Sequence, residues 1–256
     1  MRNAMNQVKR QRVISIDVSV LAYQQALEEI TLLAKHRMPS YACFANAHMT
    51  IEAHQSHEFQ RYVNSATYVF ADGMPLVFGL KWLYGTRQER IAGMDLMADV
   101  LRVSDTEALS VFLYGSTPGA LESLRQSISK NYPRAKLVGS ISPPFRELSE
   151  DEFAEHRELI NDSGAHIVLV GLGCPKQETW MAKNTININA CLLGVGGAFG
   201  LYAGLAKRAP LWMRNMGLEW LYRFAQEPKR LFYRYATTNS RFLYLFAKQL
   251  FSTRLF

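Results

Sequence analysis

The sequence predicts an α/β fold in which a Rossmann-like, largely parallel sheet is flanked by helices and followed by a C-terminal helical appendage. Short β-rich runs alternate with helical patterns through most of the 256 residues, as expected of a sheet sandwiched between helices. Several runs, such as Ile167–Val170, are continuously apolar, which is typical of strands buried on both faces. The strand pattern stops after Val195, and residues 210–256 have a helical pattern throughout.

The expected elements follow in order along the chain. The predicted strands are Arg12–Ile16, Tyr41–Ala45, Thr67–Ala71, Leu109–Tyr114, Ala135–Gly139, His166–Val170 and Ala190–Val195. Apolar residues at helical spacing predict a helix over Leu21–Lys35. Four prolines mark helix starts, namely Pro75, Pro118, Pro210 and Pro228, and Ser149 with Glu152 matches a capping box.

Composition excludes several classes of protein. Hydrophobic residues make up 48% of the chain and charged residues 20%, so the chain can bury a core and is not intrinsically disordered. Its three widely spaced cysteines favour neither a disulfide scaffold nor a Cys-x-x-Cys metal site, and they suit a reducing compartment. The first twelve residues lack the apolar stretch of a signal peptide. The uncharged run Thr185–Ala206 contains two asparagines and five glycines, which predicts a buried strand and a turn rather than a membrane span.

Positive charge is concentrated at the C-terminus. Residues 206–256 contain ten Lys or Arg and two Glu, a net charge of +8, whereas residues 1–205 contain 19 basic and 20 acidic residues. The same tail holds twelve of the thirty aromatic residues. We therefore expect a catalytic body over residues 1–205 and a basic, aromatic-rich helical appendage over residues 206–256. Arg234, Arg241 and Lys248 recur every seven residues and form one stripe, which suits either a solvated face or contact with anionic lipid headgroups.

Candidate site residues follow the predicted strands, because ligands of open α/β sheets bind at the carboxyl ends of the strands. The residues at these positions are Asn46, Asp72, Gly73, Gly115, Gly171, Gly173, Lys176, Gln177, Gly196 and Gly197. Asp72 is the best candidate for catalysis, since a carboxylate at a strand end can act as a general base. The alternative is that Asp72 caps the helix that starts near Pro75.

Other motifs indicate what kind of site to expect. Gly171–Glu178 suits an anion site at the start of a helix with Lys176 adding positive charge, or else a simple glycine turn. The glycines of Gly194–Gly200 are spaced one residue too far apart for a dinucleotide fingerprint, which disfavours an oxidoreductase. His48, His54 and His57 lack the order of a metal-binding helix motif, so we expect neither metal nor cofactor. An Asp-x-Asp motif, whose carboxylates could hold a metal ion in a sugar-transferring enzyme, is also missing. An enzyme of that kind would have to neutralise the leaving diphosphate with Arg90 and the basic tail.

An ordered set of motifs from about Ile14 to Tyr235 resembles the bacterial WecG/TagA/CpsF glycosyltransferases, or glycosyltransferase family 26. The motifs are Asp72-Gly73, Arg90-Ile-Ala-Gly-Met-Asp95, Gly171-Leu-Gly-Cys-Pro-Lys-Gln-Glu178, Gly194-Val-Gly-Gly-Ala-Phe199, Arg208-Ala-Pro-Leu-Trp212, Gly217-Leu-Glu-Trp-Leu-Tyr-Arg223 and Glu227-Pro-Lys-Arg230. The chain departs from the family's common pattern at Phe44, Ala71 and Gly200, so the resemblance implies no particular sugar.

This resemblance implies an inverting, metal-independent transfer of a sugar from a nucleotide-sugar donor, with UDP as the expected nucleotide. The implied acceptor is a saccharide on polyprenyl diphosphate at the inner face of the cytoplasmic membrane, in cell-surface polysaccharide synthesis. Asp72 matches the proposed general base, Arg90 and Gln177 match pocket residues, and appendage arginines Arg214, Arg223 and Arg230 would close over the donor diphosphate. A homo-oligomer is compatible with the sequence.

The main alternative is a nucleic-acid-binding protein that uses the basic, aromatic tail as a stacking platform. The body contains no recognisable nucleic-acid module, and the basic residues of the tail are dispersed rather than clustered. We therefore expect no nucleic-acid partner.

Overall fold

The computed structural model describes residues 8–205, 207–226 and 228–254. Side chains are described for these residues except at positions 215, 223, 229–231, 233–236 and 254.

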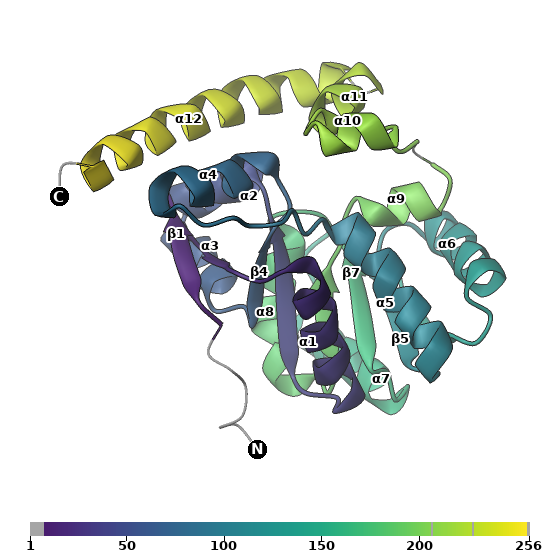
Figure 1. Cartoon of the computed structure of the whole chain (residues 1–256). Coiled ribbons are helices and arrows are strands. Elements are labelled where there is room, and N and C mark those ends of the chain that lie inside the picture. Colours follow the sequence, from purple (N-terminus) through teal and green to yellow (C-terminus); the bar gives the residue numbers. More distant parts are fainter. Residues whose placement is uncertain (1–7, 206, 227, 255–256) are drawn as a thin grey trace.

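A six-stranded, wholly parallel sheet forms the centre of the molecule (Figure 1), and its strand order is β4-β3-β8-β7-β5-β6. The strands are β3 (Ser40–Ala45), β4 (Tyr68–Ala71), β5 (Ser110–Gly115), β6 (Lys136–Ile141), β7 (Ile167–Gly171) and β8 (Cys191–Gly194). Six of the predicted strands and the predicted fold class are therefore confirmed. Because all six strands run the same way, their carboxyl ends lie at one edge of the sheet.

The first predicted strand, Arg12–Ile16, is wrong. The chain instead forms an antiparallel hairpin of β1 (Arg10–Val13) and β2 (Ile16–Ser19), outside the main sheet. Ile14 adopts a positive φ of 59°, which reverses the chain between Val13 and Ile16. This turn contains no Gly, Asn or Asp, so the usual sequence signal of a hairpin is missing. The backbone N–H of Ile14 donates to the side chain of Gln249 at 2.7 Å, which ties the turn to the C-terminal helix.

Helices cover both faces of the sheet. One face packs against α1 (Tyr23–Lys35), α5 (Gly93–Glu107), α6 (Pro118–Asn131) and α9 (Ala198–Tyr202). The other packs against α2 (Ala47–Gln55), α3 (His57–Asn64), α7 (Glu150–Asp162) and α8 (Lys176–Asn184), which a short 3-10 turn at Thr185–Asn187 follows. Residues alternate between the two cores along β3, β4, β5, β7 and β8, as Phe44 and Cys43 do in β3.

Prolines and a capping box in the sequence predicted several helix starts correctly. Pro118 is the first residue of α6, where Thr117 is the N-cap, and Ser149 forms the predicted capping box with Glu152 at the start of α7. Pro210 directly precedes α10, and Pro228 is the first residue of the long C-terminal helix.

Four helices lie over the carboxyl-terminal edge of the sheet (Figure 1). They are α4 (Met74–Tyr84), α10 (Leu211–Asn215), α11 (Glu219–Gln226) and α12 (Pro228–Arg254). The long helix α12 packs on α2 and α4. Its Phe242 and Phe246 are buried in the same core as the sheet, so the appendage is continuous with the body.

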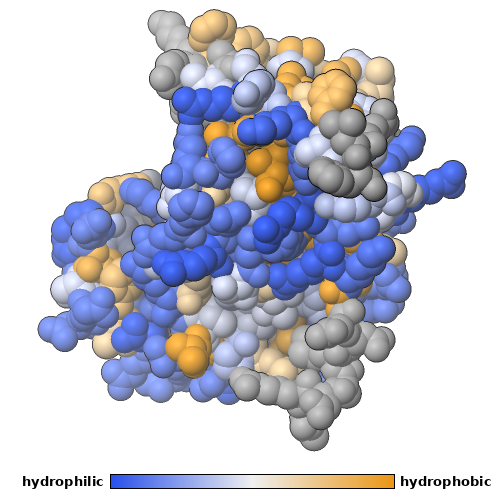
Figure 2. Space-filling view, turned by 90° about the vertical axis from the view of Figure 1, so that its left-hand side faces the viewer, coloured by the Kyte–Doolittle hydropathy of each residue, from blue (hydrophilic) through white to orange (hydrophobic). Residues whose placement is uncertain are grey.

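The outer surface of these helices is partly apolar. Leu243, Tyr244 and Phe251 of α12 are exposed, beside the exposed cations Arg241 and Lys248. Figure 2 shows hydrophobic atoms among hydrophilic ones in the upper part of the molecule, at the level of these helices. Within the described ranges, no helix is both long and apolar enough to cross a membrane.

Candidate active site

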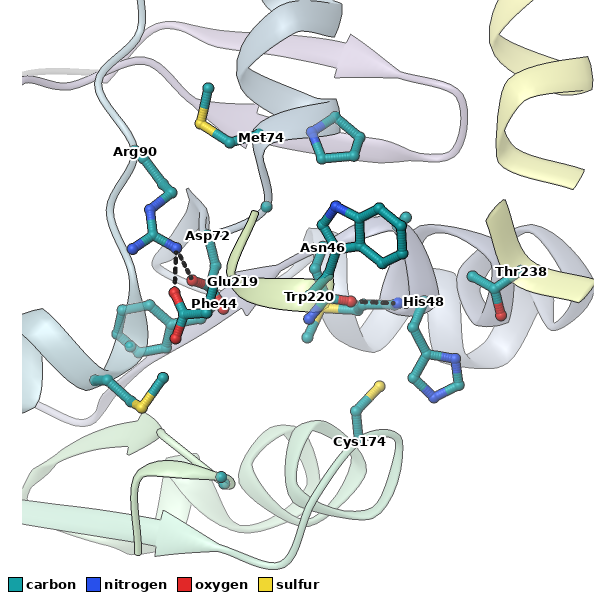
Figure 3. Close-up of a pocket in the computed structure, with 18 of the residues that line it drawn as sticks. Phe44, Asn46, His48, Asp72, Met74, Arg90, Cys174, Glu219, Trp220 and Thr238 are labelled. Carbon is teal, nitrogen blue, oxygen red and sulfur yellow. Dashed lines mark hydrogen bonds and ion pairs between the residues drawn. The ribbon is translucent and has the colours of Figure 1, made fainter. Parts of the chain in front are cut away.

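A cavity of about 700 Å³ lies at the carboxyl ends of β3, β4, β7 and β8. Its base is formed by the residues that follow these strands, among them Asn46, Asp72, Gly173 and Gly196. Its roof comes from α4, α11 and α12, so segments from both halves of the sequence enclose it (Figure 3). The volume is in the usual range for a small-molecule site.

Asp72 lies at this edge because backbone hydrogen bonds hold the loop after β4. The N–H groups of Asp72 and Gly73 both donate to the carbonyl oxygen of Ala45, at 2.9 and 3.1 Å. The N-cap of α4 is Gly73, one residue beyond Asp72, so Asp72 does not occupy the capping position that the alternative interpretation required. Its side chain is 30% exposed and lines the cavity.

Arg90 is the cation beside Asp72. The N–H of Ile91 donates to the carbonyl of Ala71 at 2.9 Å, which places Arg90 next to the end of β4. Its Nη1 atom lies 3.9 Å from Asp72 Oδ1 and 3.1 Å from an Oε atom of Glu219 in α11 (Figure 3). Both carboxylates therefore share one guanidinium that is only 20% exposed.

Asn46 and Gly73 also line the cavity and are packed against each other. Asn46 is the N-cap of α2, and its Oδ1 atom accepts a hydrogen bond from the N–H of Met49 at 3.1 Å. A Cβ at Gly73 would lie 3.1 Å from the Cβ of Asn46. Glycine at this position therefore allows the loops after β3 and β4 to approach closely.

Gln177 joins the loops after β7 and β8. Its Oε1 atom accepts from the N–H of Gly173 at 3.1 Å, and its Nε2 atom donates to the carbonyl of Gly194 at 2.8 Å and to Glu178 at 2.7 Å. A Cβ at Gly196 would lie 2.9 Å from Gln177 Oε1. The carboxamide thus fixes the cavity wall through bonds to the protein itself.

Glu178, next to Gln177, is a buried acid that does not itself line the cavity. Its side chain is fully buried, and burial raises its pKa to about 7. Its Oε1 atom accepts a hydrogen bond from Gln177, while its Oε2 atom has no hydrogen-bond partner among the described residues. Helical spacing could have predicted this burial, because Glu178 precedes the buried Met181 by three residues and so lies on the inner face of α8.

Several predicted site residues lie away from the cavity. Gly115 and Gly171 are paired neighbours in β5 and β7, and a Cβ at Gly115 would lie 2.7 Å from the backbone of Gly171. A Cβ at Gly171 would in turn lie 2.4 Å from the ring of Phe199, so both glycines permit close packing. Lys176 is exposed at the start of α8. Neither these glycines nor Lys176 lines the cavity.

Three arginines of the appendage, Arg214, Arg223 and Arg230, were predicted to contact the donor diphosphate. Arg214 lies 3.4 Å from Asp95 and does not line the cavity. The side chains of Arg223 and Arg230 lie outside the described part of the structure. Gly197 lines the cavity as predicted, and so does Phe44, one of the three departures from the common family pattern.

Further lining residues were not among the predicted site residues, although Cys174 and Trp220 belong to motifs that the sequence analysis noted. His48 of α2, Cys174, Trp220 of α11 and Thr238 of α12 lie at the end of the cavity away from Arg90 (Figure 3). Across the described residues, no group of three or more His, Cys, Asp or Glu side chains is arranged to hold a metal ion.

One comparison with known families matches almost the whole chain. The sequence model of the family described as "Glycosyl transferase WecG/TagA/CpsF family" matches residues 11–255. The match spans the sheet, the cavity and the appendage that roofs it. This chain belongs to the WecG/TagA/CpsF family of glycosyl transferases and is therefore a glycosyltransferase.

Proposed function

We propose that this enzyme is an inverting, metal-independent glycosyltransferase that moves a sugar from a UDP-sugar to a saccharide on polyprenyl diphosphate. In this role it contributes to cell-surface polysaccharide synthesis at the inner face of the bacterial cytoplasmic membrane. The observation that carries the proposal is the placement of Asp72 in the cavity, at a strand end and beside Arg90.

The proposed reaction is a single displacement. The acceptor hydroxyl oxygen bonds to C1 of the donor sugar while the bond from C1 to the diphosphate oxygen breaks, and its electron pair leaves with UDP. Asp72 accepts the hydroxyl proton as general base. Attack opposite the leaving group inverts the configuration at C1.

The leaving diphosphate needs positive charge, which we assign to Arg90 and to the appendage. Arg90 lines the cavity, while Arg223 and Arg230 remain predicted diphosphate contacts. Guanidinium groups suit this task because they bind phosphate oxygens through two parallel N–H bonds. The apolar walls at Phe44 and Trp220 suit the flat faces of a nucleobase or a sugar.

A ligand panel separates this function from the alternatives. Thermal shifts would be measured with UDP, UDP-sugars, NAD and single-stranded DNA. We expect selective stabilisation by the UDP compounds, because a ligand that binds only the folded state raises the melting temperature. Stabilisation by DNA alone would support the nucleic-acid alternative, which the burial of two tail aromatics, Phe242 and Phe246, disfavours. Stabilisation by NAD alone would support an oxidoreductase.

We further propose that the exposed face of α12 contacts the membrane surface. Tyr244 and Phe251 are exposed on this helix together with Arg241 and Lys248, a mixture typical of helices that lie in the lipid headgroup region. Each basic residue near an anionic surface contributes about 1 kcal/mol.

Point substitutions test the membrane contact without removing the core residues of α12. The double variant Tyr244→Ser, Phe251→Ser should sediment less with anionic liposomes, while its affinity for UDP should change little, because neither residue lines the cavity. The matched control is Phe145→Ser, Ile186→Ser, which alters two exposed apolar residues of the body. Equal sedimentation of both variants and the wild type would place the membrane contact elsewhere.

A further inference from the structure

Asp95, in the first turn of α5, gathers three arginine side chains from two parts of the chain. It accepts hydrogen bonds from Arg90 at 3.5 Å, from Arg214 at 3.4 Å and from Arg208. Arg90 belongs to the body, whereas Arg208 and Arg214 flank the start of α10. Asp95 does not line the cavity, so its contacts lie behind the wall that Arg90 forms.

A second ion pair ties the same arginine to the appendage. Glu219, the first residue of α11, lies 3.1 Å from Arg90, and its side chain is only 12% exposed. Arg90 therefore contacts Asp72, Asp95 and Glu219 at once. The network connects the proposed base, the wall of the cavity and the roof.

The two appendage arginines depend on Asp95. For both Arg208 and Arg214, Asp95 is the acceptor found in the described residues, and their buried Nε atoms have no partner there. Single exposed ion pairs contribute little, but these side chains are about a quarter exposed and share one acceptor. Loss of that acceptor would leave partly buried guanidinium groups unpaired.

We propose that Asp95 is a positioning residue that fastens α10 and α11 over the cavity and orients Arg90 toward the donor. Its carboxylate holds Arg208 and Arg214 from the roof and Arg90 from the wall, so placement of the roof and of Arg90 is coupled. The kinetic part of this inference rests on the proposed function, while the structural part does not. The roof also contacts the body at a point that does not involve Asp95, because Gly217, between α10 and α11, packs closely on Met74 of α4.

Hydrogen exchange of the full-length protein tests the fastening directly. In Asp95→Asn, we expect exchange of backbone amides in residues 211–226 to rise about tenfold, with exchange in the sheet strands unchanged. Asp99→Asn is the matched control, since Asp99 lies one turn further along α5 and bonds to Tyr23 and Arg102 of the body. A variant Asp95→Glu, which keeps the carboxylate, should restore most of the protection.

Kinetics test the positioning of Arg90. We expect Asp95→Asn to raise KM for the donor and Kd for UDP about tenfold and to lower kcat less, with Asp95→Glu again intermediate and Asp99→Asn like the wild type. Unchanged exchange over residues 211–226, or an equal increase throughout the protein, would overturn the fastening. A local increase with unchanged donor KM and UDP Kd would overturn the positioning of Arg90. If the wild type itself binds no UDP, the proposed function fails while the exchange result still decides the role of Asp95.

Discussion

At the scale of single residues, the site depends on one carboxylate whose surroundings are fixed by the backbone. Asp72 is held by the bonds of its loop to Ala45 and lies beside Arg90. We predict that Asp72→Asn lowers kcat by about 10²- to 10⁴-fold, the usual contribution of a general base. Donor affinity should stay near that of the wild type, because Asn is nearly isosteric. Steady-state kinetics and UDP calorimetry on the same preparation measure both quantities.

Asp105→Asn is a suitable control for this variant, because Asp105 lies at the far end of α5 and pairs with Arg134. Its turnover should equal that of the wild type. Turnover near normal in Asp72→Asn would remove Asp72 from the reaction.

Glu178 gives a prediction about stability and pH. Its folded pKa of about 7 lies above its ordinary value of 4.5. Between these two values the folded state holds a proton that the unfolded state has lost, so the free energy of unfolding falls as pH rises toward 7 and is lowest above it. The full penalty is on the order of 3 kcal/mol. Glu178→Gln cannot ionise, so it should gain stability relative to the wild type as pH rises from 5 to 8.

Urea denaturation of both proteins at several pH values measures that difference. Burial lowers the pKa values of His156 and His166, so their contribution to the free energy of unfolding rises with pH below pH 6.5, opposite to that of Glu178. Because both proteins contain these histidines, the difference between the two proteins cancels that contribution. The exposed Glu158→Gln should show no such trend. A constant difference between Glu178→Gln and the wild type would contradict a raised pKa.

Several site residues could be predicted because ligands of open α/β sheets bind at the carboxyl ends of the strands. That rule chose Asp72, Asn46, Gly73 and Gln177, which line the cavity, and the need for positive charge pointed to Arg90. The same rule chose Gly115 and Gly171, which do not line it. The contacts of Gln177 could not be predicted, because they depend on how two loops far apart in sequence approach each other. Lys176 was misplaced for a related reason, since the first turn of α8 turns it outward.

At the scale of elements, α12 both covers the cavity and contributes side chains to the hydrophobic core. Phe246 is buried against Phe242 and Trp82, with ring centroids 6.0 and 5.9 Å apart. We predict that Phe246→Ala lowers the free energy of unfolding by about 3 kcal/mol, as large-to-small core changes do. Phe251→Ala, on the same helix but 71% exposed, should change it by less than about 0.5 kcal/mol. Urea denaturation compares the two, and equal effects would mean that α12 does not pack on the body.

The order of strands and helices was largely predictable, because buried parallel strands are short, apolar and separated by helices. The hairpin β1–β2 was not, since its turn relies on tertiary contacts from Gln249 and Thr50 rather than on turn residues. The docking of α12 was left open between packing and lipid contact. The structure shows that Phe242 and Phe246 pack on the body, while other side chains of the same helix are exposed.

At the scale of the whole molecule, the proposed chemistry places positive side chains where other enzymes use a metal. We predict that turnover survives a saturating concentration of EDTA, because Arg90 and the appendage arginines would neutralise the diphosphate. The assay is transfer from a UDP-sugar with and without EDTA. Loss of turnover that added Mg²⁺ or Mn²⁺ restores would contradict this assignment of charge.

The proposed function requires a nucleotide-sugar donor to occupy the cavity between the sheet edge and the C-terminal helices. Hydrogen exchange with and without saturating UDP tests this most directly. If the donor binds there, exchange should slow in the loops after β3, β4, β7 and β8 and in residues 217–226 and 238–243, with α7 and β6 unchanged. Protection confined to regions outside the cavity, with the loops around Asp72 and Gly196 unaffected by bound UDP, would contradict it.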